Sequence, residues 1–298
     1  MKHVALLVLF AASCGGSSPA ETTTSPTPPT PPAPPPKETA FSVTVTGAGR
    51  PVVFVPGLGS PGSVWDATVA HLGGKVQAHV LTLAGFAGVA PIPPPFLLTV
   101  HEQLVDYVKH LDHPIVVGHS LGGVEVLWLA ETNSADLSGI VDVEGLPFLA
   151  GVLDPTTTEA KASESAKLIH DEMMKQSPEQ FAVQTKQFLA GMITKPGDLD
   201  RIAAATAKSD QETFATAFSE LMAKDLRADL PKITTKVTII AAADQSGVPR
   251  PQLEAAWHTQ IDAIKGASFH MVDNSKHFVM LDQPDAFYAL IDRALAGN

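Results

Sequence analysis

The sequence predicts an α/β fold in which a mostly parallel central sheet is flanked by helices. Short apolar runs alternate along the chain with longer runs of helical periodicity, an order that builds a parallel sheet covered on both faces. The pattern Gly-x-Ser-x-Gly stands at one of these strand-to-helix junctions. The alternation stops between residues 148 and 230, where only helical patterns occur. With 298 residues, the chain is long enough for one large α/β domain with a helical insertion.

The N-terminus has the outline of a secretory signal peptide. An unbroken apolar stretch from Val4 to Phe10 is too short to span a bilayer, and small residues lead from it to Cys14. We therefore expect residues 1–13 to be removed. Small residues before a cysteine resemble a bacterial lipobox, although Ala11 stands where leucine is usual. This resemblance implies that Cys14, the only cysteine, carries lipid. The alternative is ordinary signal cleavage nearby with an idle cysteine.

The segment 14–40 is expected to be a lipid-anchor cysteine followed by a linker. Proline makes up half of the residues from Pro19 to Pro36, with Thr and Ser between them. Such a stretch cannot bury a core and prefers the extended polyproline II conformation. A lipid anchor on a stiff spacer would hold a globular domain off a membrane surface. The predicted location is therefore the bacterial cell envelope, with membrane contact only through the N-terminal anchor.

The remaining elements follow from their periodicity. The stretch 41–46 alternates apolar and polar residues, which is typical of a partly exposed strand. The other expected strands are 51–55, 79–83, 114–117, 140–143, 236–243 and 267–272. The expected helices outside the insertion are 65–72, 97–111, 121–132, 252–264 and a last helix that starts at Pro284. Inside the insertion, Ser177-Pro178-Glu179-Gln180 predicts a helix start with a capping box.

Ser120 is the candidate nucleophile. A sharp turn between a buried strand and a helix forces the serine into a strained conformation and lifts its Oγ clear of the sheet. Gly118 and Gly122 lack a Cβ, so strand and helix can pack closely around this turn. The N–H of Leu121 then lies at a helix N-terminus, where developing negative charge is favoured.

These residues make the chain similar to an α/β-hydrolase of the serine esterase or lipase type, from about Phe41 to the C-terminus. The resemblance implies a core of residues 41–147 and 231–298 and a helical cap of residues 148–230. In that family the loop after the second strand supplies an oxyanion N–H and usually reads His-Gly. Here it reads Pro56-Gly57, and the N–H of Leu58 is the candidate donor beside that of Leu121.

The resemblance also implies a catalytic triad. His277 fits the family's histidine loop after the last strand, and Asp244 follows the strand 236–243 at its carboxyl end. The order Ser120, Asp244, His277 is the family's order of nucleophile, acid and base. Glu144, at the end of an earlier strand, is the alternative acid, because some family members place their acid there. If Asp244 is the acid, Glu144 could instead brace the hinge of the cap.

The predicted function is the hydrolysis of a small-molecule carboxylic ester through an acyl-enzyme on Ser120. The alternatives are cleavage of a lactone, thioester or carbon–carbon bond, or a non-catalytic protein that binds a small apolar ligand. No cofactor and no metal are expected, because neither a dinucleotide Gly-x-Gly-x-x-Gly after the first strand nor a zinc-ligand spacing occurs. The net charge of −11 argues against nucleic acid as a partner, and we expect a monomer.

Overall fold

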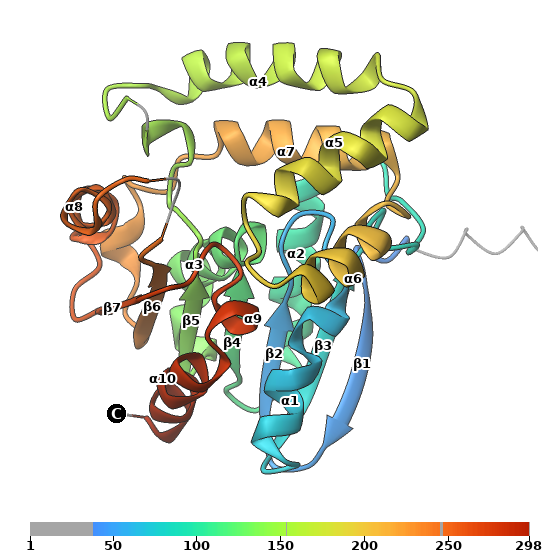
Figure 1. Ribbon diagram of the computed structural model, residues 1–298. Helices are drawn as coiled ribbons and strands as arrows, with labels where there is room; N and C mark the ends of the chain where they lie inside the picture. The colour runs from blue at the N-terminus through green and yellow to red at the C-terminus, as the bar shows by residue number, and fades with distance from the viewer. Residues whose placement is uncertain (1–37, 153, 245–246, 298) are drawn as a thin grey trace, which may run out of the picture. The chain divides into compact units, whose positions relative to one another are not determined.

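The computed structural model describes residues 38–152, 154–244 and 247–297 (Figure 1). The predicted signal peptide, the lipidated Cys14 and most of the linker lie outside the described residues. No helix within the described ranges has both the length and the apolar character needed to cross a membrane.

The described residues form one sheet of seven strands in the order β1-β3-β2-β4-β5-β6-β7. β1 pairs with β3 in the antiparallel direction, and all other neighbours are parallel, as the sequence predicts. The strands are β1 (Phe41–Gly47), β2 (Arg50–Val55), β3 (Val76–Leu83), β4 (Ile115–His119), β5 (Gly139–Val143), β6 (Val237–Ala242) and β7 (Ser268–Val272). β3 begins three residues before its predicted start.

The strands bury their two faces in two separate hydrophobic cores. Alternate side chains of a strand point to opposite faces, so Val53 and Val55 of β2 join one core while Val52 and Phe54 join the other. The first core is covered by α2 (Phe96–Lys109), α3 (Leu121–Asn133) and α8 (Arg250–Ile261), and the second by α1 (Asp66–Leu72) and α10 (Pro284–Ala296). β4 and β5 are buried along their whole length, which explains their largely apolar sequences; His119 on β4 and Asp142 on β5 are the polar exceptions.

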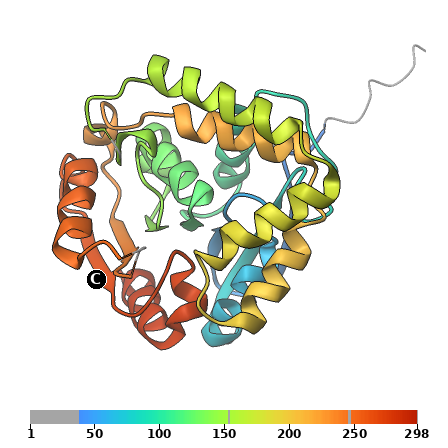
Figure 2. The same ribbon diagram turned by 45° about the horizontal axis from the view of Figure 1, so that its top comes forward.

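The insertion between β5 and β6 is helical, as its sequence predicts. It contains α4 (Glu159–Met174), α5 (Pro178–Ala190), α6 (Pro196–Thr206) and α7 (Gln211–Ala223). The predicted capping box at Ser177 and Gln180 is present at the start of α5. Figures 1 and 2 show these helices lying over the ends toward which the parallel strands point. The carboxyl ends of the strands are where open α/β sheets bind ligands, so the insertion covers that region.

Candidate active site

Ser120 lies at the sharp turn between β4 and α3. Its backbone has φ 55° and ψ −117°, a strained conformation for a residue with a side chain. The Ser120 N–H donates to the carbonyl oxygen of Val143 on β5 (2.8 Å), which ties the turn to the neighbouring strand. The Gly-x-Ser-x-Gly pattern therefore forms the strained turn that the sequence predicts.

The glycines of this pattern allow backbone segments to approach one another. A Cβ on Gly122 would overlap the carbonyl oxygen of Val55 and would lie 2.7 Å from that of Pro56. A Cβ on Gly118 would overlap the backbone of Gly122 itself. The first turn of α3 therefore packs directly against the end of β2, and this contact excludes any larger residue.

His277 lies in the loop between β7 and the short helix α9 (Val279–Asp282). The loop is held on both sides of the histidine. The backbone N–H of Lys276 donates to Oδ2 of Asp282 (2.8 Å), and that of Phe278 donates to the carbonyl oxygen of Met192 (3.2 Å). The His277 side chain is 19% exposed, so its imidazole is accessible but fixed at its base.

Glu144, directly after β5, holds the His277 imidazole. Its Oε2 lies 2.9 Å from Nδ1 of His277, and its Oε1 accepts a hydrogen bond from the backbone N–H of Ala242 (2.6 Å). The Glu144 N–H donates to the carbonyl oxygen of Ile240 (3.0 Å), and its backbone has φ 61°. Its side chain is only 3% exposed. A carboxylate held at both oxygens leaves little freedom to the ring that it contacts.

The expected pairing of Asp244 with His277 is therefore wrong, and the alternative, Glu144, occupies that place. Asp244 lies two residues beyond the end of β6 and its side chain is exposed. Its backbone N–H donates to the carbonyl oxygen of Ser275 (3.0 Å), which joins the strand end to the histidine loop. Both acids follow strands at the same sheet edge, but only the left-handed turn at Glu144 directs a buried carboxylate toward the imidazole.

Ser120, His277 and Glu144 line one cavity of about 390 Å³, called here the Ser120 cavity. Leu58, Ser60 and His119 line it from the core. The other lining residues are predominantly apolar. The core also contributes Gly57, Val124, Trp257 and Phe278, and the insertion and its flank contribute Leu146, Leu149, Val152, Thr185, Phe188, Leu189, Met192, Thr206, Phe214, Phe218, Leu221 and Met222. A cavity of this size with a few convergent polar groups is typical of a small-molecule site.

The two backbone positions predicted as oxyanion donors flank Ser120. Gly57 and Leu58 line the Ser120 cavity. A Cβ on Gly57 would lie 3.0 Å from Nδ1 of His119 and 3.0 Å from Cβ of Ser120, so the loop after β2 approaches the serine closely. Leu121 is the first residue of α3, where the backbone N–H has no partner within the helix.

His119 is a site residue that the sequence predictions missed. Its Nε2 lies 3.0 Å from the carbonyl oxygen of His277, and its ring contacts the rings of Trp65, His277 and Phe278. Complete burial, followed by the charge of His277, holds the pKa of His119 well below its ordinary value. The neutral ring therefore donates from Nε2. The sequence feature that could have identified His119 as a site residue is its position directly before Ser120, on a strand with both faces buried.

Asp142 supports the turn that carries Glu144. It is fully buried on β5, and its Oδ1 accepts a hydrogen bond from the N–H of Gly145 (2.8 Å). Burial raises the pKa of Asp142 well above its ordinary value, and the nearby Glu144 acts in the same direction. A protonated Asp142 adds no second negative charge beside the carboxylate of Glu144.

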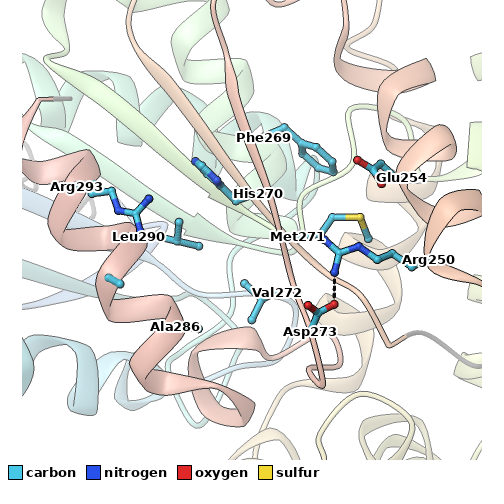
Figure 3. Close-up of a pocket in the computed structure, with 11 residues that line it drawn as sticks. Arg250, Glu254, Phe269, His270, Met271, Val272, Asp273, Ala286, Leu290 and Arg293 are labelled. Carbon is cyan, nitrogen blue, oxygen red and sulfur yellow. Dashed lines mark hydrogen bonds and ion pairs between the residues drawn. The ribbon is translucent and has the colours of Figure 1, made fainter.

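A larger hollow of about 600 Å³ lies along the edge strand β7, between α8 and α10 (Figure 3). It shares no residue with the Ser120 cavity, and the described residues that line it include neither serine nor cysteine. Arg250 and Asp273 form an ion pair across one side of it. Within the described ranges, no cluster of three or more His, Cys, Asp or Glu could hold a metal ion.

Comparison with known proteins agrees with this architecture. Residues 52–290 match the model of the alpha/beta hydrolase family, which is most of the chain. The chain belongs to this family.

Curated relatives of this α/β-hydrolase include pimeloyl-[acyl-carrier protein] methyl ester esterases. That of Vibrio vulnificus strain YJ016 is 23% identical over 248 residues, which cover 81% of this chain and 92% of the relative. That of Vibrio atlanticus is 25% identical over 197 residues, which cover 64% of this chain and 74% of the relative.

Solved structures share the fold of this α/β-hydrolase. The thermophilic esterase from Thermogutta terrifontis has a TM-score of 0.71 and 18% identity, with 86% of this chain and 93% of that chain covered. The enol-lactonase from Burkholderia xenovorans LB400 has a TM-score of 0.71 and 17% identity, with 86% of this chain and 96% of that chain covered. At these identities the likeness shows the fold alone.

Proposed function

We propose that this protein is a carboxylic ester hydrolase that works through an acyl-enzyme on Ser120. The observation that carries the proposal is the meeting of the strained Ser120 turn with the His277–Glu144 pair in one largely apolar cavity. The curated relatives, which are named as methyl ester esterases, support the same class of reaction.

In this mechanism His277 is the general base. It removes the proton from Oγ of Ser120 as the oxygen attacks the ester carbonyl carbon, and then gives this proton to the leaving alcohol. Glu144 keeps the proton of the imidazole on Nδ1, which leaves Nε2 free to act as the base, and it stabilises the imidazolium that forms. A water molecule activated by the same histidine then attacks the acyl-enzyme and releases the acid.

The backbone N–H groups of Leu58 and Leu121 would stabilise the oxyanion of each tetrahedral intermediate. Both belong to rigid segments, the loop after β2 and the first turn of α3, so they need no rearrangement during the reaction. Removing one such donor typically lowers kcat by a factor on the order of 10²–10³.

In this proposal the bond that is cleaved is a carboxylic ester. The same three residues, Ser120, His277 and Glu144, would also cleave a lactone or a thioester. The helices α4 to α7 would serve as the cap over the site.

The N-terminal proposals are lipidation of Cys14 and anchoring of the enzyme in a bacterial envelope, and they rest on the sequence pattern. Replacing Cys14 with Ser would test them by releasing the protein from membranes.

The decisive test is covalent labelling with a fluorophosphonate followed by peptide mass spectrometry. We expect the label on Ser120, and we expect Ser120→Ala to lose both the label and esterase activity while its circular dichroism stays that of the wild type. Ser60, the other serine that lines the cavity, provides a matched control, because Ser60→Ala should still be labelled. A folded protein without any label on Ser120 would instead indicate a binding protein on a hydrolase scaffold.

A further inference from the structure

A second apolar cavity adjoins the Ser120 cavity inside the helical insertion. It has a volume of about 420 Å³ and lies among α4, α5 and α7. We call it the distal cavity. The side chains that line only this cavity are Leu168, Ile169, Glu172, Met173, Gln176, Phe181 and Gln184, whereas Thr185, Phe188, Phe214 and Phe218 line both cavities. These four shared residues form the boundary between the distal cavity and the Ser120 cavity.

The boundary between the two cavities has one buried part and one partly exposed part. Phe214 is buried and packs edge-on against Phe181, with ring centroids 5.2 Å apart. Phe188, near the end of α5, is 49% exposed, and Phe218 is only partly buried. The buried rings of Phe181 and Phe214 form an apolar floor, and the rings of Phe188 and Phe218 are the less confined part of the boundary between the cavities.

The charges around the two cavities select against ionic ligands. Among the described residues that line either one, none is lysine or arginine. The carboxylate of Glu144 is engaged by His277 near the serine. At the distal cavity the charged group is Glu172, whose exposed carboxylate already pairs with Lys175 (2.6 Å), so the lining offers no free charge to an ionic ligand. An uncharged, flexible and apolar group suits this space, and a chain that ends in a carboxylate does not.

We propose that the distal cavity binds the far part of a long, uncharged acyl chain whose ester carbonyl lies at Ser120. This proposal rests on the proposed ester hydrolysis and names its substrate class: esters of medium- to long-chain aliphatic acids. The chain would run from Ser120 past Phe188 and Phe218 into the space beside α4. Each methylene that leaves water for this apolar space should raise kcat/KM about fourfold, until the chain fills both cavities.

The test compares p-nitrophenyl esters from butanoate to decanoate on the wild type and on two tryptophan variants. Ile169→Trp fills the distal cavity from α4, at a residue that does not line the Ser120 cavity. Val183→Trp is the matched control, since Val183 is 56% exposed on α5 and lines neither cavity. We expect the decanoate-to-butanoate ratio of kcat/KM to fall at least tenfold in Ile169→Trp and to keep its wild-type value in Val183→Trp.

A second variant avoids any change to buried packing. Leu168 is 68% exposed at the rim of the distal cavity, so Leu168→Lys adds a cation without disturbing a core. The wild type should prefer the decanoate ester at least tenfold over the half ester of decanedioic acid, whose far end carries a carboxylate. Leu168→Lys should narrow this preference several-fold, because the new cation pairs with that carboxylate.

The possible failures are distinguishable. If the wild type hydrolyses butanoate but gains nothing from longer chains, or if both Ile169→Trp and Leu168→Lys keep the wild-type profiles, the acyl-chain assignment is overturned and ester hydrolysis stands. If the folded wild type hydrolyses none of the esters and Ser120 takes no fluorophosphonate, both proposals fail together.

Discussion

Glu144 combines two features that are unfavourable for an ordinary residue. Its backbone is left-handed at φ 61°, and its carboxylate is almost completely buried. A left-handed conformation costs a residue with a side chain about 1–2 kcal/mol, and a buried carboxylate needs partners for its oxygens. The Ala242 N–H and the His277 ring supply those partners. Such local strain is typical of functional positions, which agrees with the role proposed for this residue.

Exchanging each acid for its amide separates the two candidates. Glu144→Gln keeps the size of the side chain but presents the His277 ring with a neutral amide, so we expect kcat to fall by a factor on the order of 10⁴. Asp244→Asn changes an exposed group and should leave kcat within about twofold of the wild type. Steady-state kinetics with a short-chain ester measures both variants, and circular dichroism checks their folding. A crippled Asp244→Asn beside an active Glu144→Gln would reverse the assignment.

At the residue scale, the identity of the acid beside His277 could not be predicted from the sequence. Ser120 could be named because Gly-x-Ser-x-Gly constrains its own backbone, and His277 because it follows the last strand. Choosing between Asp244 and Glu144 requires the direction of each side chain, which periodicity does not contain. The left-handed turn at Glu144 is held by long-range contacts with β6, where the Glu144 N–H donates to the carbonyl oxygen of Ile240 and its Oε1 accepts from the Ala242 N–H, together with the local hydrogen bond from the Gly145 N–H to Asp142.

At the scale of elements, the site is formed by the segments that follow three strands. The turn after β4 carries Ser120, the turn after β5 carries Glu144, and the loop after β7 carries His277. His119 links the first of these to the last, since its ring donates to the His277 carbonyl oxygen. Misplacement of one element by an ångström would separate groups that must share a proton.

A methyl group added at Gly122, in the sharp turn that carries Ser120, should therefore damage the whole site. In Gly122→Ala the new Cβ would overlap backbone oxygens of β2, which cannot move aside as a flexible side chain could. We expect a loss of stability of at least about 2 kcal/mol, seen as a fall in Tm of several degrees, together with a large loss of kcat. Thermal unfolding followed by circular dichroism and an ester assay measure the two effects.

Gly197 gives the matched control for that variant. It lies in the first turn of α6, and a Cβ there meets nothing within 4 Å. Gly197→Ala should raise the stability by about 0.5–1 kcal/mol, because alanine favours the helix over the unfolded chain. Equal Tm values for the two alanine variants would show that the close approach of α3 to β2 is not required.

The elements themselves were the most predictable part of the molecule. β2, β4 and β5 are largely apolar because both of their faces are buried, and α5 carries its start signal in Ser177, Pro178 and Gln180. β3 begins earlier than predicted, because Gln77 and Ala78, which have low strand propensity, pair with β1 and β2 through their backbones. The two cavities in the insertion depend on how its helices pack, which no single helix determines.

At the scale of the whole molecule, several titratable groups lie buried away from the catalytic site. Glu125 on α3 lies beside His101 on α2 (Oε2 to Nδ1 3.6 Å), Glu131 lies further along α3, and Lys224 follows α7 with its ammonium over the Trp128 ring. Burial, followed by the charge of Lys224, lowers the pKa of His101 to about 4. Burial raises the pKa of Glu125 well above its ordinary value. These groups join the core to the end of the insertion without taking part in the proposed chemistry.

The buried acids and the buried histidine make stability depend on pH in opposite directions. His101 has a lower pKa when folded, so its contribution is lost as pH falls from about 6.5 toward about 4. Burial, followed by the charge of Asp229, raises the pKa of Glu131 to about 8, so the folded state holds a proton that the unfolded chain has lost above about 4.5. The contribution of Glu131 is therefore lost as pH rises toward about 8. Between about pH 6.5 and pH 8 the contribution of His101 no longer changes, so it does not oppose the loss of the Glu131 contribution, and the stability of the folded protein should decline.

Replacing Glu131 with Gln should remove a large share of that decline. The amide keeps the shape of the protonated acid and cannot ionise, whereas Lys224 and Lys232, which favour ionisation of Glu131, stay in place. We expect Tm of the wild type to fall between pH 6.5 and 8, and the fall to be about 2–4 °C smaller in Glu131→Gln. Glu164→Gln, at an exposed position on α4, controls for the loss of one charge and should show the wild-type fall. Calorimetry at pH 6.5, 7.2 and 8.0 measures all three proteins, and an unchanged fall in Glu131→Gln would mean that Glu131 is already ionised in the folded protein at pH 6.5.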